Sequence, residues 1–118
     1  MAGQIVIADP ALVSPIDPAI GVQPTRFVLN KLIHNVEDLL SVNLFWDATV
    51  PVRIEELVGR GKADYHRFGG LKNNAGTYDS GGNFTGAAGF TGRVVATTEG
   101  WSSGILSFSL ILEFKKSV

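Results

Sequence analysis

The chain has 118 residues, a formal net charge of -1 and no cysteine. This length fits one domain with its own hydrophobic core, and the lack of cysteine excludes disulfide scaffolds, thiolate zinc sites and cysteine nucleophiles. Ten basic residues balance eleven acidic ones, and no basic run is longer than Lys115-Lys116. We therefore expect no nucleic-acid partner.

The N-terminus carries no charged segment followed by a continuous apolar stretch, as a signal peptide would. No run approaches the roughly 18 apolar residues that a membrane helix needs. The sequence therefore predicts a soluble chain that is not exported and has no membrane partner.

Residues 1–25 differ in composition from the rest of the chain, because they hold four of its five prolines. Proline removes a backbone donor and biases the preceding residue toward extended conformations, so we expect an extended N-terminal arm over residues 1–25. The arm is too apolar to be a disordered tail, and it lies either against its own domain or against a neighbouring subunit. Its expected contact residues are Ile5, Val6, Ile7, Leu12, Val13, Ile16, Ile20 and Val22.

Residues 26–118 form the expected single domain, which begins with residues typical of strands. Strands are predicted over 26–34, 40–46 and 50–58, with turns at 35–38 and 47–49. A short amphipathic helix over 30–40 is the alternative, since apolar residues also fall at helical spacing there. Pro51 suits the start of a strand or an edge position.

The remaining elements alternate with segments rich in glycine. We predict a turn at 59–62, a strand over 63–68, a Gly-rich loop over 69–92, a strand over 93–98, a turn at 99–104 and a last strand from 105 to 116. Long loops without secondary structure of their own are usually functional or mobile.

The last strand shows the clearest pattern in the chain. Apolar side chains recur at every second position, namely at Leu106, Phe108, Leu110, Leu112 and Phe114. This period of two predicts a long strand with one buried face. These residues, with Phe27 and Trp46, are the expected core.

Tight turns without helical crossovers indicate an antiparallel sheet. We therefore expect an all-β fold, an antiparallel β-sandwich of the jelly-roll or immunoglobulin-like kind with an extended N-terminal arm.

Few residues carry chemistry. Asp64 and His66 share a face if they lie on a strand, which would suit a metal or an acid/base pair, but a solvated polar face explains them better. Adjacent Glu55 and Glu56 point to opposite faces of a strand, so they cannot flank one substrate bond, and we expect one of them to face inward or toward a partner.

The segment Asp79-Ser80-Gly81-Gly82-Asn83 has oxygen donors among glycines but lacks the glutamate of a calcium loop, so it reads as an ordinary turn. Asn83-Phe84-Thr85 matches the acceptor motif for N-glycosylation. Because no secretory signal is expected, we assign the match no function. No nucleophile elbow or phosphate-binding loop is present. We expect a non-enzyme with no catalytic, cofactor-binding or metal-binding residues.

Four aromatic residues in or near the Gly-rich loop are the remaining candidates for partner contacts. They are Tyr78, Phe84, Phe90 and Trp101. Exposed aromatic side chains often mark interaction surfaces. The alternative is that they fold back over the sandwich, while the arm covers a sheet edge.

Several segments, taken in order, resemble small virion structural proteins of tailed bacteriophages. They are the proline-containing arm, Arg-Phe-Val-Leu-Asn-Lys-Leu-Ile, Leu-Phe-Trp-Asp-Ala-Thr, Phe-Gly-Gly-Leu-Lys-Asn-Asn-Ala-Gly and Ser-Phe-Ser-Leu-Ile-Leu-Glu-Phe-Lys-Lys. The resemblance implies a capsid decoration or cement protein that assembles in the host cytoplasm. Its implied partners are further copies of itself, as a homo-oligomer, and other virion proteins such as the major capsid protein. A receptor- or carbohydrate-binding module of a phage tail fibre is the alternative.

Overall fold

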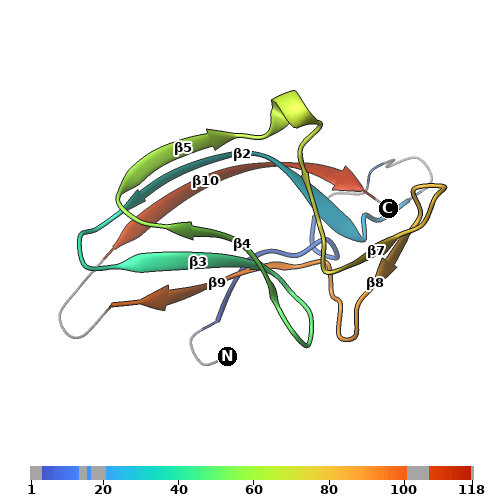
Figure 1. Cartoon of the computed structure of the whole chain (residues 1–118), viewed down its shortest axis with the longest axis horizontal. Coiled ribbons are helices and arrows are strands. Elements are labelled where there is room, and N and C mark those ends of the chain that lie inside the picture. The colour runs from blue at the N-terminus through green and yellow to red at the C-terminus, as the bar shows by residue number, and fades with distance from the viewer. Residues whose placement is uncertain (1–3, 14–15, 17–20, 101–106, 118) are drawn as a thin grey trace.

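Two antiparallel sheets pack face to face in the computed structural model, which describes residues 4–13, 16, 21–100 and 107–117. Figure 1 shows the sheets as two layers of an elongated molecule whose extents are 47 × 28 × 28 Å. The described residues contain strands and one 3₁₀ helix but no α-helix. The expectation of an all-β antiparallel sandwich is confirmed.

The first sheet has four strands, and its outer strands are far apart in the sequence. Their spatial order is β1 (Ile5–Ala8), β9 (Val94–Glu99), β3 (Ser41–Trp46) and β4 (Val52–Leu57). The central strand β3 pairs with β9 from Ser41 opposite Glu99 to Trp46 opposite Val94. A bulge on β4 shifts its register against β3 between Leu44 and Phe45.

The second sheet is built around the longest strand. Its order is β10 (Phe108–Ser117), β2 (Arg26–Val36) and β5 (Arg60–Asp64), and the short β6 (Leu71–Lys72) also pairs with β2. The 3₁₀ helix η1 (His66–Phe68) lies between β5 and β6. A separate hairpin of β7 (Gly76–Tyr78) and β8 (Phe84–Gly86) completes the described structure.

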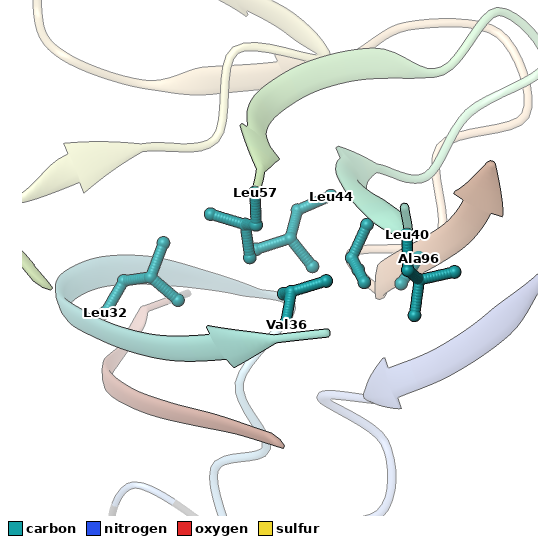
Figure 2. Packing of buried hydrophobic residues seen from close by; sticks show 7 residues of the cluster. Leu32, Val36, Leu40, Leu44, Leu57 and Ala96 are labelled. Carbon is teal, nitrogen blue, oxygen red and sulfur yellow. The ribbon is translucent and has the colours of Figure 1, made fainter. Parts of the chain in front are cut away.

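Side chains from the inner faces of both sheets form the core. Figure 2 shows Leu32 and Val36 of β2 pointing toward Leu44 of β3 and Leu57 of β4. Leu32 and Leu44 have no exposed surface. Burying a side chain of this size contributes roughly 1.5 to 3 kcal/mol, so this interlayer contact is a principal source of stability.

A second buried cluster contains two of the expected core residues, Phe27 and Trp46. The last strand, β10, contributes apolar side chains to the core from every second position, but these inward side chains are only half-buried. The reason is that β10 is an edge strand, so its inner face has a neighbouring strand on one side only. Leu106 lies outside the described residues.

The strand predicted over 26–34 is confirmed as β2, which continues to Val36, so the alternative of a helix over residues 30–40 is wrong. Two other predictions were wrong. The predicted turn at 59–62 is largely strand β5, which begins at Arg60 and ends at Asp64. The strand predicted over 63–68 therefore ends early, and η1 occupies its last three residues. The predicted loop over 69–92 contains β6, β7 and β8.

The described part of the expected arm lies partly within the sandwich. Residues 5–8 form β1, which pairs with β9, and the extended arm is not confirmed as a separate element. Ile7 packs against both core clusters, while Val13 packs against the second one. Of the other expected arm contacts, Ile20 lies outside the described residues.

The turn between β2 and β3 contains a strained residue. Leu39 has a φ of 70°, is 87% exposed, and is followed by Leu40, whose N–H donates to the Glu37 carbonyl at 3.2 Å. A left-handed conformation costs a leucine about 1 to 2 kcal/mol. Leu39→Gly should therefore raise the free energy of unfolding by about 0.5 to 1 kcal/mol after the entropic cost of glycine, as measured by urea denaturation.

Leu39→Ala is the matched control, because it removes the exposed side chain but keeps the Cβ atom that causes the strain. It should leave stability nearly unchanged. Equal stabilisation by both variants would show that the backbone conformation is not the cause.

Candidate functional site

An aromatic cluster lies at the β7–β8 hairpin. The Tyr78 and Phe84 ring centroids are 5.0 Å apart, and Phe84 and Phe90 have the same separation. Phe90 in turn packs against the buried cluster that contains Trp46. The cluster therefore connects the hairpin to the core.

Two glycines allow these rings to lie directly on the hairpin backbone. A Cβ atom at Gly76 would lie 2.6 Å from the Phe84 ring, and one at Gly86 would lie 2.7 Å from the Phe90 ring. A residue larger than glycine at either position would have to displace the neighbouring ring. The glycine-rich composition here therefore serves close packing of aromatic rings.

The expected loop contacts differ in exposure. Tyr78 is 37% exposed, whereas Phe84 and Phe90 are half-buried. The Tyr78 hydroxyl donates to the Asn73 carbonyl at 2.8 Å, which fixes the ring at the surface. Trp101 lies outside the described residues. Among the three described aromatic residues of this group, Tyr78 is thus the one that a partner is best able to contact.

A small basic pocket of about 210 Å³ adjoins Tyr78. The described residues that line it include the cationic side chains of Arg26, Lys72 and Lys115 but no acidic one. The Arg26 guanidinium carbon lies 4.7 Å from the Phe84 ring centroid, and Lys72 Nζ lies 5.6 Å from that of Tyr78. Cations over aromatic faces in a concave surface suit an anionic or sugar-like ligand.

The turn between β7 and β8 is held by one carboxylate. Asp79 Oδ1 accepts hydrogen bonds of 2.9 Å from the Gly81 and Asn83 backbone N–H groups, and Oδ2 accepts from Asn83 Nδ2 at 3.3 Å. The hydrogen bonds from Asn83, followed by those from the glycine amides, lower the pKa of Asp79 below its ordinary value of 3.8. This is ordinary turn chemistry, as the sequence predicted.

The candidate acid/base residues are not brought together. Asp64 ends β5 and its Oδ1 accepts from the His66 backbone N–H at 2.9 Å, so the same-face arrangement expected for a strand is wrong. The Asp64 side chain therefore bonds the backbone at the start of η1. The described residues contain no group of three potential metal ligands from His, Cys, Asp and Glu.

The glutamate pair also differs from expectation. Glu55 and Glu56 are both exposed, so neither faces the core of this chain, and the other option, that one faces a partner, stays a prediction. The cause of this shared exposure is the β4 bulge, which interrupts the alternation of side chains. Glu56 lies 3.5 Å from Arg53, and Glu55 accepts from the Tyr65 hydroxyl at 3.5 Å. Burial and then the Glu55 charge raise the pKa of Tyr65.

A wider hollow of about 400 Å³ lies beside the β2–β3 turn. Its described lining includes Glu37, Asp38 and Glu99. Glu37 and Asp38 lie in the turn after β2 and Glu99 ends β9, and no cationic side chain is among the described residues that line the hollow.

The arm presents the other candidate surface. Leu12 is 84% exposed, Val6 51%, Ile5 43% and Ile16 42%. Asp9 forms an ion pair of 3.0 Å with Arg93, which holds the segment after β1 against the start of β9. The exposed aliphatic side chains are therefore carried by a segment that is attached to the sandwich.

Comparison with known proteins gives no assignment. No protein-family model, curated protein or solved structure shows a significant match to this chain. Within the described part of the chain, no helix is long and apolar enough to span a membrane.

Acid should loosen the β7–β8 turn. Since the pKa of Asp79 is lower when folded than when unfolded, its hydrogen bonds stabilise the turn above about pH 4 and are lost as pH falls through the folded-state value. An NMR titration should place the Asp79 carboxyl pKa below 3.8 and show the Asn83 amide shifting with it. Asp79→Asn, which keeps one acceptor oxygen, should abolish that pH dependence, and a pKa at or above 3.8 would contradict the assignment.

Proposed function

We propose that this chain is a non-enzymatic structural protein of a virion, most specifically a capsid decoration or stabilising protein. The class of particle comes from the resemblance of its segments to virion proteins of tailed bacteriophages. The observation that carries an assembly function is the exposed aliphatic surface of residues 5–16. Its partners are copies of the chain itself and the repeating surface of the major capsid protein.

The physical argument concerns where the exposed apolar groups lie. Scattered exposed aliphatic residues are normal on a soluble protein, but several on one edge mark an interaction surface. Ile5 and Val6 lie on β1, the edge strand of the first sheet, and Leu12 and Ile16 follow later in the same N-terminal part of the chain. A partner that covers them gains hydrophobic stabilisation without any change in the sandwich.

A second function, binding of a receptor or carbohydrate, is favoured by the basic pocket beside Tyr78. An aromatic ring with cationic neighbours is able to stack against a sugar while the cations attract its acidic groups. This alternative requires no self-association.

The arm is tested by substitution rather than deletion. Removing residues 1–22 would take away β1, which pairs with β9, and Ile7, which packs in the core. Val6→Thr with Leu12→Ser instead removes exposed apolar surface and retains a β-branched residue in β1. Light scattering should show the full-length assembly of 12.6 kDa chains breaking into smaller particles, with affinity at the arm contact at least about tenfold weaker.

The control is a double variant that changes the same two residue types, a valine and a leucine, at positions outside the arm. Val50→Thr with Leu39→Ser changes side chains that are 77% and 87% exposed and should leave assembly unchanged. Equal loss in both double variants would remove the arm as the specific contact. Mass spectrometry of purified phage particles that carry the gene should find the chain in many copies, and its absence from them would overturn the virion assignment.

Tyr78→Ala discriminates the second function. If the pocket binds an acidic sugar, the wild type should bind sialyllactose in an NMR titration, and Tyr78→Ala should weaken binding at least about tenfold. Ser80→Ala, in the same hairpin turn, should have no effect. A wild type that shows no saturable shifts at the pocket would exclude this ligand class.

A further inference from the structure

Strand β10 has a backbone edge with no partner among the described residues. It pairs with β2 along Phe108–Ser117, and nothing else described pairs with it (Figure 1). The carbonyls of Ser107 and Ser117 accept hydrogen bonds from Glu37 and Thr25, the residues that flank β2. Odd-numbered residues therefore turn their backbone groups toward β2.

Because backbone groups alternate in a strand, the even-numbered residues turn theirs away from β2. Phe108, Leu110, Leu112 and Phe114 thus direct N–H and C=O groups to the open edge. Their side chains, on the inner face, are only half-buried. One additional strand would satisfy the backbone groups and cover the rest of this apolar surface.

The other long edges of the sandwich are protected. β4 exposes Arg53, Glu55 and Glu56, and β5 exposes Arg60 and Lys62. Charges of this kind discourage pairing with another strand. The segment of β10 from Phe108 to Leu112 has no charge and no proline, and at its centre Ile111 is 65% exposed.

We infer that β10 pairs antiparallel with β10 of a second copy across a two-fold axis at Ile111. This inference rests on the proposed function in one respect: it names the contact through which copies of the chain associate. The two sheets then join into one that runs β5-β2-β10-β10-β2-β5. Two-fold interfaces bring the same surface of both subunits together, so the strand has to be complementary to itself.

The residues of β10 fit this register. With Ile111 opposite Ile111 of the second copy, Leu110 faces Leu112 and Phe108 faces Phe114 on the inner face. On the outer face Ser109 faces Glu113. Apolar side chains therefore meet apolar ones, and no like charges are opposed.

Neighbouring registers fit less well. An axis at Glu113 would place two glutamates directly opposite each other, which is destabilising. An axis at Leu112 would set Ile111 against Glu113 and Phe108 against Lys116. Of these three registers the axis at Ile111 fits best, and it specifies which residues meet in the dimer.

A cross-link tests the register directly, because the chain has no cysteine of its own. In the full-length protein, Ile111→Cys would bring two Cβ atoms to about 4.5–5.5 Å in a pair without backbone hydrogen bonds. Mild oxidation should therefore give a disulfide-linked dimer on a non-reducing gel. Ser109→Cys, on the same exposed face, would place its two copies four residues apart, about 13 Å, and should not cross-link.

Charge provides the second test. Ile111→Lys opposes two cations at the axis and should convert a particle of twice 12.6 kDa to the single chain by light scattering. Ser109→Lys should remain dimeric because the new cation faces Glu113. Equal cross-linking at both cysteines, or a dimer that survives Ile111→Lys, would overturn the inference.

The outcome separates this inference from the proposed function. A wild-type protein that is monomeric at millimolar concentration overturns self-pairing, but detection of the chain in phage particles would leave the virion function standing. A dimer that is lost in the arm variant but persists in Ile111→Lys assigns association to the arm and likewise overturns pairing through β10.

Discussion

Burial of β2 from three sides is the constraint on which the rest of the structure depends. β10 pairs along one edge of β2, β5 and β6 share the other, and the inner face contributes Leu29 and Leu32, which have no exposed surface. A single strand therefore organises the second sheet and supplies residues to both core clusters. The opposite sheet meets this face mainly through Leu44 and Trp46 of β3. Hydrophobic burial between these two central strands fixes the position of the sandwich edges formed by β1 and β10.

Alternation of side chains explains why most of the fold was predictable. Val42, Leu44 and Trp46 recur with a period of two and are all buried on one face of β3. The pattern failed where glycine has a role other than turning the chain. Gly61 was taken as a turn residue, but it lies in β5, where an added Cβ atom would be 2.6 Å from the His34 ring. Close approach between side chains of distant strands leaves no local signal in a sequence.

The candidate sites show the same division between local and long-range information. The aromatic residues of the Gly-rich segment were visible as candidates, but the edge-to-face packing of Phe84 on Phe90, which in turn packs against the core, depends on the three-dimensional position of the hairpin. Arg26 and Lys115 join Lys72 at the pocket because β10 pairs with β2, and these cations are too far apart in the chain to form a motif. Whether a cation faces an aromatic ring is decided by strand register, which the sequence did not specify.

The last strand shows how one pattern is compatible with two environments. Its alternation predicted a buried face, yet an edge strand in a single chain has only one neighbouring strand, so Leu110 and Leu112 remain half-buried. Edges that stay exposed generally carry charge, proline or bulges, as β4 does. β10 has an uncharged centre and a regular backbone on its open side. The simplest physical account of a strand that is apolar on its inner face, unprotected at its edge and self-complementary about Ile111 is that another strand covers it after folding.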